Sequence, residues 1–304
     1  MNQISVLGIF VADLCFFSND IPIRGQTILG TKHTIGPGGK GSNQAVAAAR
    51  SGGNVNFITK IGEDAYGEIA LSLYRESGVS LDSIIIDSDL STGVAGIFID
   101  ETTGDNIINV VPAAADKLQP KDIDNHLESL KNSKVFLTQL ETPMETTLYG
   151  LDKAKQFECL TILNPAPAAE LHESVFKSID FFTPNETEAG FYLNATLDSK
   201  NDIELAGKEF LNKGVKNIII TLGDQGSYFA NRDESFFLEP LTLKSKVIDT
   251  TGAGDAFNGA LSAALANNFN YKDSLMFATK VAGISTTRLG AANSIPTKKE
   301  IDNY

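Results

Sequence analysis

Short apolar runs alternate with longer stretches of mixed composition along the chain, and this alternation predicts the fold. The runs are apolar at consecutive positions, as in strands that are covered on both faces. After a first strand near the N-terminus, they occupy 55–61, 134–140, 159–164, 179–185 and 217–223. Helical patterns lie near 42–52, 66–78, 120–132, 144–157, 202–214, 253–268 and 272–288. This order predicts an α/β fold with a doubly wound, mostly parallel sheet.

Two segments interrupt the alternation of strands and helices. Residues 10–35 and 92–112 have the pattern of antiparallel hairpins, and the second contains the turn sequence "ETTGD" at 101–105. We therefore expect a small β-sheet, inserted as a lid, within a single domain that spans residues 1–304.

Composition restricts the class of partner. The chain has 304 residues, of which 42% are hydrophobic and 21% charged, as in an ordinary globular protein. Its formal net charge of -13 disfavours nucleic acids and anionic membranes and favours small molecules. The two cysteines, Cys15 and Cys159, have no paired spacing, which argues against a zinc site or a disulfide framework and fits the cytoplasm. The apolar N-terminus contains Asp13 and is too short to span a membrane.

The stretch "DTTGAGDAFNGA" at 249–260 contains the first candidate chemistry. Three glycines surround Asp255 where an extended segment meets a helical pattern. Gly252 and Gly254 permit a phosphate to approach the backbone at a helix N-terminus, where N–H groups and the helix dipole favour an anion. Asp255 would then lie beside a reacting phosphoryl group and act as a base. Alternatively, it only caps the helix.

A second glycine-rich stretch, "GPGGKGSNQAVAAA", occupies 36–49. Its GxGxxG spacing is weak evidence for a dinucleotide site, because a probable hairpin separates it from the first strand. It is not a Walker loop either, since Gly41 follows Lys40 where that motif needs Ser or Thr. The loop places Lys40 and Asn43 at the start of a helix, either as ligand-binding groups or as a turn with a solvated lysine.

Six motifs occur together in one order: "GGKGSNQAVAAAR" (38–50), "QLETP" (139–143), "NPAPA" (164–168), "PNETEA" (184–189), "TLGDQG" (221–226) and "DTTGAGDAFNGA" (249–260). With these motifs the chain resembles the ribokinase family of carbohydrate kinases, also called the phosphofructokinase B family, from Val6 to its end. "GGKGSNQA" and "NPAPA" resemble the ribokinase subgroup more than fructokinases or adenosine kinases.

The resemblance implies an ATP-dependent kinase that phosphorylates the primary hydroxyl of a pentose, with ribose as the expected substrate. Asp255 would be the base, and Gly252, Ala253 and Gly254 would form an anion hole. The positions that match sugar-binding residues are Val11, Asp13, Gly39, Lys40, Asn43, Glu141 and Asp255. For these polar side chains, turn and helix-cap chemistry is the alternative. The resemblance further implies a cytoplasmic homodimer that associates through its lids.

The nucleotide and cation positions follow from the same resemblance. ATP would bind at Asn185, Thr221, Leu222, Gly223, Asp224, Gln225, Gly226, Gly254 and Thr279. Asn185 and Glu188 match an NxxE pattern that influences Mg²⁺, although Asn185 is also a plausible helix cap. A K⁺ site would include Asp249, Thr251, Ser285, Arg288, Gly290 and Ser294. The alternative for Asp249 is a buried carboxylate whose oxygens accept backbone N–H groups.

Val11 departs from the family's pattern, in which Asn-x-Asp usually ends the first strand. The aspartate is kept as Asp13, but Val11 cannot form a hydrogen bond with a sugar hydroxyl. A sugar with one hydroxyl fewer, such as 2-deoxyribose, is therefore a second candidate substrate.

Some residues and function classes remain open at this level. His33, His126 and His172 are too scattered to predict a metal cluster. Phe10, Phe16 and Phe17 either line the sugar site or lie between the lids of a dimer. A non-catalytic sugar sensor on this fold would not need Asp255, and a nicotinamide-dependent oxidoreductase would leave "GAGD" unexplained.

Overall fold

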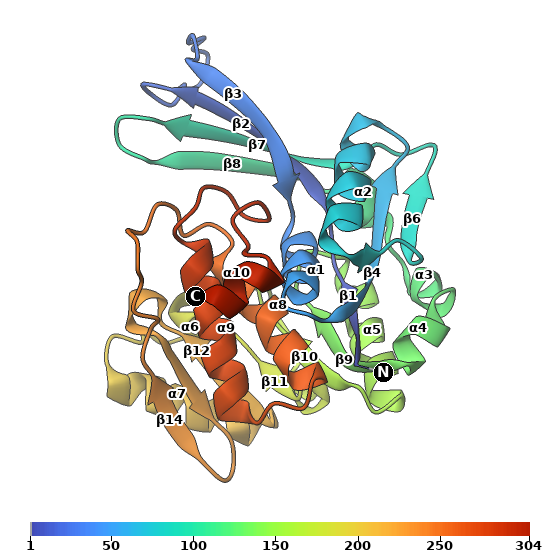
Figure 1. Ribbon diagram of the computed structural model, residues 1–304, viewed down its shortest axis with the longest axis vertical. Coiled ribbons are helices and arrows are strands. Elements are labelled where there is room, and N and C mark those ends of the chain that lie inside the picture. Colours follow the sequence, from blue (N-terminus) through green and yellow to red (C-terminus); the bar gives the residue numbers. More distant parts are fainter. Residues whose placement is uncertain (1) are drawn as a thin grey trace.

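The computed structural model describes residues 2–304 and contains a ten-stranded main sheet (Figure 1). Its strands are β1 (Gln3–Leu7), β4 (Asn54–Gly62), β5 (Val79–Ser80), β6 (Ile84–Asp87), β9 (Ser133–Thr138), β10 (Leu160–Leu163), β11 (Phe181–Phe182), β12 (Asn217–Thr221), β13 (Ser227–Ala230) and β14 (Ser235–Leu238). They lie in the order β14-β13-β12-β11-β10-β9-β1-β4-β5, and β6 also pairs with β4. Only the β12–β13 and β13–β14 pairs, at one edge, are antiparallel.

Helices cover both faces of the main sheet. They are α1 (Lys40–Arg50), α2 (Ala65–Ser77), α3 (Pro120–Asp124), α4 (Leu127–Lys131), α5 (Met144–Gln156), α6 (Glu186–Leu193), α7 (Lys200–Lys213), α8 (Ala253–Ala266), α9 (Tyr271–Ser285) and α10 (Lys298–Asn303). Alternate residues of β9 enter different cores, since Val135 and Leu137 pack with α1, α8 and α9, whereas Phe136 packs with α5 and α7. The predicted doubly wound α/β fold is confirmed.

A small sheet projects from the main body in Figure 1 and has the order β3-β2-β7-β8. Its strands are β2 (Val11–Ser18), β3 (Lys32–Gly38), β7 (Gly93–Asp100) and β8 (Asn106–Val111). Each predicted hairpin is antiparallel, and the two hairpins join through parallel pairing of β2 with β7. The small sheet is thus confirmed, while its action as a lid and the single-domain organisation stay predictions.

Several local predictions need correction. The helix expected at 120–132 is two short helices, α3 and α4, which are separated by Asn125 and His126, residues of modest helix propensity. Helix α6 was not among the helical patterns, although Asn185 was a candidate cap for it, and the antiparallel edge formed by β13 and β14 was not expected. Phe10 neither lines a sugar site nor faces a second lid, because it is fully buried and its ring packs edge-on against Tyr74 at a centroid distance of 6.3 Å.

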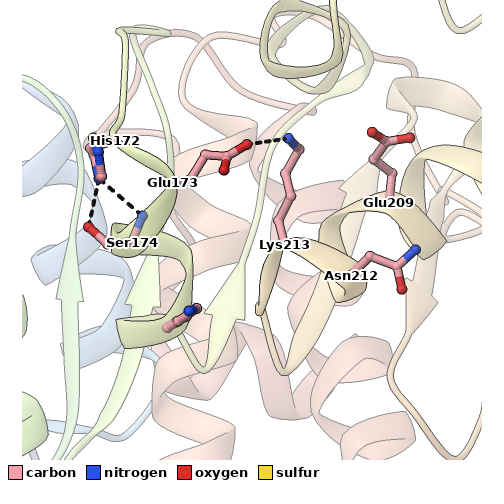
Figure 2. A pocket seen from close by; sticks show the side chains of 7 residues that line it. His172, Glu173, Ser174, Glu209, Asn212 and Lys213 are labelled. Carbon is pink, nitrogen blue, oxygen red and sulfur yellow. Dashed lines mark hydrogen bonds and ion pairs between the residues drawn. The ribbon is translucent and has the colours of Figure 1, made fainter.

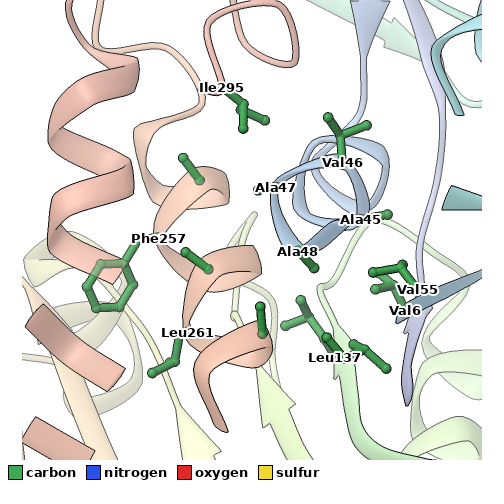
Figure 3. Packing of buried hydrophobic residues seen from close by; sticks show 14 of the residues in the cluster. Val6, Ala45, Val46, Ala47, Ala48, Val55, Leu137, Phe257, Leu261 and Ile295 are labelled. Carbon is green, nitrogen blue, oxygen red and sulfur yellow. The ribbon is translucent and has the colours of Figure 1, made fainter. Parts of the chain in front are cut away.

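Glycines bring α1 close to its neighbours. A Cβ on Gly41 would lie 2.6 Å from Gly8 Cα, and a Cβ on Gly259 of α8 would lie 2.4 Å from the Gln44 carbonyl oxygen. Side chains larger than hydrogen therefore do not fit at these two contacts. In Figure 3 the alanines of α1 lie beside α8, which contributes Phe257 and Leu261 to the same core. This close packing holds the first turns of α1 and α8 against each other.

Candidate active site

Polar residues gather where the parallel strands of the main sheet end. Gln139 follows β9, Asn164 follows β10, and Thr183 follows β11, so all three lie at the carboxyl edge of adjacent strands. The first turns of α1 and α8 contribute to the same region, because Asn164 contacts Gln44 of α1 and Gln44 contacts Asp255 of α8. Open α/β sheets bind ligands at this edge.

Asp255 lies in the first turn of α8 and is 7% exposed. One carboxylate oxygen accepts a hydrogen bond from Asn43 Nδ2 and the other accepts one from Gln44 Nε2, each over 2.9 Å. Burial raises the pKa of Asp255, while the nearby Lys40 and the two amide donors lower it by a smaller amount. The helix-cap alternative does not describe this side chain, because its hydrogen-bond partners belong to α1.

Backbone N–H groups at the start of α8 form a candidate anion site. Gly252 has a φ of 74°, and a Cβ there would lie 2.9 Å from Ala291, which explains the glycine. Ala253 N already donates to Thr250 O over 3.1 Å, so this member of the predicted anion hole is engaged. Within residues 2–304, Gly254 and Asp255 have N–H groups with no protein acceptor, which leaves them available to a ligand.

Carboxylates dominate the predicted sugar-binding set. Lys40 N donates to Glu141 Oε2 over 2.8 Å, which joins the start of α1 to the loop after β9. Burial is the main reason that the pKa of Glu141 rises to about 7, and Asp255 and Asp13 add to the rise. Burial likewise raises the pKa of Asp13 to about 6. Both carboxylates are only partly exposed, and they are suited to accepting hydrogen bonds from sugar hydroxyls.

Glycines make room for this carboxylate cluster. A Cβ on Gly38 would lie 2.2 Å from Asp13 Oδ1, so only glycine fits beside the carboxylate. Gly39 precedes α1 with a φ of 87°, and a Cβ there would lie 2.6 Å from the Ile9 carbonyl oxygen. The two glycines in "GGK" are therefore explained by space and backbone conformation.

Val11 has an apolar environment. It is 3% exposed and belongs to a cluster with Ile9, Ala95 and Ala115. In β2 it lies two residues before Asp13, so both side chains point to the same face of the small sheet. The face that carries Asp13 therefore includes an aliphatic position with no hydrogen-bonding capacity.

A buried polar network lies behind Asp255, and the sequence-based site prediction included none of its five members. Its members are Gln44, Gln139, Asn164, Thr183 and Asn258, which are at most 7% exposed. Gln139, Asn164 and Asn258 occur inside the motifs "QLETP", "NPAPA" and "DTTGAGDAFNGA", so the motifs marked the segments without giving these roles. The contacts span several elements and therefore required the fold.

The predicted nucleotide segments meet at the ends of β11 and β12. Thr221 forms a β-bridge with Asn185, and the Asn185 and Glu188 side chains form a capping box at the start of α6. The helix-cap alternative for Asn185 thus holds in this structure. Gly226 has a φ of 91°, and a Cβ there would lie 2.0 Å from Leu238 O. Thr279 lies on α9, which packs against α8.

The predicted cation residues come from two adjacent segments. Asp249 N donates to Thr286 O over 3.2 Å, and Gly290 N donates to Asp249 Oδ2 over 2.8 Å. Thr251 N donates to the other Asp249 oxygen over 2.9 Å. Burial alone would raise the pKa of Asp249, but the hydrogen bonds from Thr251 and Gly290 together lower it below its ordinary value. The backbone-satisfied alternative therefore describes Asp249 here, although each carboxylate oxygen keeps a second lone pair.

Comparison with known families matches residues 1–298 to the pfkB family of carbohydrate kinases. The chain belongs to this family. It is 36% identical to the ribokinase of Bacillus subtilis over 307 residues, which covers 99% of both chains. It is 32% identical to the deoxyribokinase of Salmonella typhi over 303 residues, with coverage of 99% of this chain and 98% of the relative.

Longer and structural relatives complete the comparison. The chain is 35% identical over 305 residues to the bifunctional ribokinase/ribose-5-phosphate isomerase A of Fructilactobacillus sanfranciscensis, and this match covers all of this chain but 56% of that protein. The structure of Arabidopsis thaliana ribokinase complexed with ribose and ATP superposes with a TM-score of 0.92 at 26% identity, with coverage of 99% and 97%. As a pfkB-family carbohydrate kinase, the protein is a phosphotransferase with an alcohol group as acceptor.

A pocket elsewhere on this pfkB-family protein, shown in Figure 2, has a volume of about 630 Å³. It is lined by His172, Glu173, Ser174, Lys177, Glu209, Asn212 and Lys213. Four of its polar side chains form two pairs, since Lys213 Nζ lies 3.6 Å from Glu173 and His172 Nδ1 lies 2.8 Å from Ser174 Oγ. It contains none of the motif residues and is not the candidate active site.

Two further observations concern metals and membranes. Across residues 2–304, no group of three or more His, Cys, Asp and Glu side chains is arranged to hold a metal ion. The same residues include no helix that is both long and apolar enough to cross a lipid bilayer.

Proposed function

We propose that this protein is an ATP-dependent pentose kinase that phosphorylates the primary hydroxyl of ribose. The observation that carries the proposal is the environment of Asp255, a buried carboxylate held by Asn43 and Gln44 next to the free N–H groups of Gly254 and Asp255. A base and an anion site thus lie in one helical turn. The ribokinase complex with ribose and ATP, which has the same fold, supports the substrate pair.

Asp255 would remove the proton from the primary hydroxyl of the sugar, while the hydroxyl oxygen forms a bond with the γ-phosphorus of ATP. The bond between that phosphorus and the bridging oxygen breaks, and ADP leaves with the electron pair. Backbone N–H groups of Gly254 and Asp255 would stabilise the negative charge of the transferring group. Because phosphoryl transfer depends mostly on positioning and electrostatics, a carboxylate is a sufficient base.

Sugar hydroxyls would be bound by Asp13, Lys40, Asn43 and Glu141. Asn43 Oδ1 is buried without a protein partner, which supports a role in accepting a hydrogen bond from a ligand. Gly39 would permit close approach of the sugar to the backbone.

The apolar position of Val11 supports 2-deoxyribose as a second candidate substrate. A hydroxyl placed against the cluster of Ile9, Val11 and Ala95 would lose its water without gaining a partner, at a cost of about 1 to 3 kcal/mol. The similarity to a deoxyribokinase at 32% identity is consistent with this alternative.

ATP would bind along Thr221–Gly226, with Asn185 and Glu188 close to its phosphates. Gly223 supports this placement, because the space beside its Cα is open and an added Cβ would meet no atom within 4 Å. Its backbone has a φ of 55°, which favours glycine. Mg²⁺ would arrive with the nucleotide and neutralise phosphate charge, and it would keep water ligands. Asn185 and Glu188 would influence its placement from the helix start.

K⁺ would bind beside the anion site, between the segment of Asp249 and Thr251 and the segment of Ser285, Arg288, Gly290 and Ser294. An ionised carboxylate and backbone carbonyl oxygens are hard donors that suit this ion. The contact between Gly252 and Ala291 supports coupling between the two segments. The charge of the ion would help to order the start of α8.

A homodimer would form through the small sheet. Phe16, Ile35, Phe98, Ile107 and Val111 share the face opposite to Asp13, and each is between 38% and 53% exposed. Phe16 and Phe98 stack with a centroid distance of 5.5 Å. An apolar face of this extent favours a second copy of the chain as its cover.

The free Cys15 and Cys159 fit a cytoplasmic location.

A coupled ADP-release assay tests the proposed function. It would compare pentoses, 2-deoxypentoses, hexoses and nucleosides with ATP and Mg²⁺, with and without K⁺. Sugar-dependent ADP release with ribose or 2-deoxyribose is the expected result. Sugar binding without ADP release would instead favour a sensor, and binding of NAD but not ATP would favour an oxidoreductase.

A further inference from the structure

Gln44 uses every polar group of its side chain within the protein. Its Nε2 donates to Asp255 Oδ1 over 2.9 Å and to Asn164 Oδ1 over 3.0 Å, and its Oε1 accepts from Gln139 Nε2 over 2.6 Å. The residue has no exposed surface. It therefore cannot bind a substrate directly, and it acts on the site through the groups that it contacts, of which Asp255 is the proposed base.

The orientation of the Gln44 amide is determined by a backbone group. Thr183 O can only accept, and it accepts from Asn164 Nδ2 over 3.0 Å. Asn164 must therefore present its oxygen to Gln44, and Gln44 must present its NH₂ group to Asn164 and Asp255. The donor of Gln139 agrees with this orientation, because it meets the Gln44 oxygen. A flipped amide would place oxygens against oxygens at two of these contacts.

The same network reaches the backbone of the anion site. Thr183 Oγ1 lies 2.6 Å from Asn258 Oδ1, and Asn258 Nδ2 donates to Gly254 O over 2.9 Å. One continuous chain of hydrogen bonds thus joins the Asp255 side chain to the peptide that contains Gly254. Thr183, at the end of β11, therefore contacts both the branch that leads to the Asp255 side chain and the branch that leads to the Gly254 peptide.

We propose that Gln44 is a positioning residue that keeps Asp255 ionised and aimed at the substrate, with its own amide oriented by Gln139 and Asn164. The proposal rests on the proposed function, in which Asp255 is the base. Gln44 differs from its neighbour Asn43, which also donates to Asp255 but keeps a buried, unpartnered oxygen for a ligand.

Charged groups around Asp255 explain why a neutral donor matters. Lys40 from α1 favours the ionised carboxylate. Glu141, in the loop after β9, and Glu188, in α6, are close enough that the charge of Asp255 raises the pKa of each. Burial opposes the ionisation of Asp255. A hydrogen bond from Gln44 favours the ionised form without adding a charge that could bind the sugar or ATP.

Two substitutions separate this role from packing. Gln44→Met keeps the volume but removes both donors, and should raise the pKa of Asp255. Gln44→Glu keeps an acceptor for Gln139 but turns a carboxylate oxygen toward Asp255 and Asn164, so the two acids should share a proton and the pKa should rise further. Ser42→Ala is the matched control, because Ser42 is buried in the same helix and bonds to Tyr74 rather than to Asp255.

The acid limb of kcat/KM against pH should move to higher pH in Gln44→Met and further in Gln44→Glu, with Ser42→Ala following the wild type. A carbon-13 NMR titration of carboxyl-labelled aspartate, with the Asp255 signal assigned by Asp255→Asn, reports the same pKa without substrate. This second measurement keeps the two proposals distinguishable if no sugar is phosphorylated. Identical Asp255 titrations in the wild type and both Gln44 variants would overturn the role of Gln44.

Discussion

Asn43 Nδ2 donates to Asp255 Oδ2 over 2.9 Å, although the two residues are 212 positions apart in the chain. The contact joins the "GGKGSNQ" stretch to the "GAGD" stretch, the two glycine-rich starts of α1 and α8. Each stretch alone had a plausible structural explanation, as a turn or as a helix cap. Their contact favours a shared ligand site over either explanation.

The first prediction concerns the base. Asp255→Asn should lower kcat by roughly 10² to 10⁴, because the hydroxyl proton loses its acceptor. ATP affinity should stay within a few-fold, since the N–H groups of Gly254 and residue 255 remain. Steady-state kinetics and a nucleotide-binding titration measure the two effects. Retention of more than about half of the wild-type turnover would contradict the assignment.

The second prediction concerns the cation. Replacing K⁺ by tetramethylammonium should depress turnover, because the bulky ion cannot fit among the oxygens near Asp249. Asp249→Ala should abolish this dependence on K⁺. The measurement is initial rate against salt identity at constant ionic strength. Equal rates in both salts for the wild type would remove K⁺ from the proposed site.

The third prediction concerns sugar selectivity. Val11→Asn should raise kcat/KM for ribose relative to 2-deoxyribose by about fivefold or more, since it supplies a partner to a hydroxyl near Asp13. Both sugars should be measured on the wild type and the variant. Val94→Asn is the matched control, because Val94 lies next to the Val11 register position but on the opposite face of the small sheet. An unchanged ratio in Val11→Asn would mean that this position does not discriminate between ribose and 2-deoxyribose.

The fourth prediction follows from Glu141, whose pKa in the folded protein is about 7. In the unfolded chain Glu141 has the ordinary pKa of Glu, about 4.3, and releases its proton near that pH. Between about pH 4 and pH 7 the folded state therefore binds more protons, and the free energy of unfolding falls as the pH rises. Tm of the ligand-free wild type should fall, relative to Glu141→Gln, across this window. Parallel Tm curves for the two proteins would argue against a raised pKa.

The fifth prediction concerns the apolar face of the small sheet. Phe98→Asp should convert a dimer into a monomer, because it places a charge beside Phe16 in the proposed interface. Light scattering after gel filtration measures the mass. Leu205→Asp is the control, since Leu205 is an equally apolar, exposed residue on α7. A wild-type protein that is monomeric at all concentrations would refute the dimer.

The fold was largely predictable because its strands are buried on both faces, so that runs such as 134–140 are apolar without alternation. Helix α8 was recognisable from the glycines before it and the alanines within it. Helix α6 was missed because it is short and has few buried residues on one face. Phe10 was misplaced because an apolar residue beside a sheet edge looks the same in sequence whether it faces a ligand or the core.

The candidate site was predictable only where one residue carries a distinctive chemistry. Asp255 and Lys40 stand out as charged residues next to glycines, and Glu141 stands out as the carboxylate of the "QLETP" motif. Gln44 and Asn164 do not, since neutral amides are common and their roles depend on which partner each meets. The two-residue offset of Val11 from Asp13 was visible in the sequence, but its apolar cluster required the pairing of β2 with β7.

The close contact of α1 with α8 has a consequence for synthesis of the protein. Gly259 packs against the backbone of Gln44, so the polar end of α1 reaches its final environment only when α8 is present. During translation α1 emerges early, yet its buried amides have no carboxylate to meet until the chain beyond residue 259 has left the ribosome. The nascent N-terminal part thus carries only half of the candidate active site, which is completed when most of the polypeptide has been made.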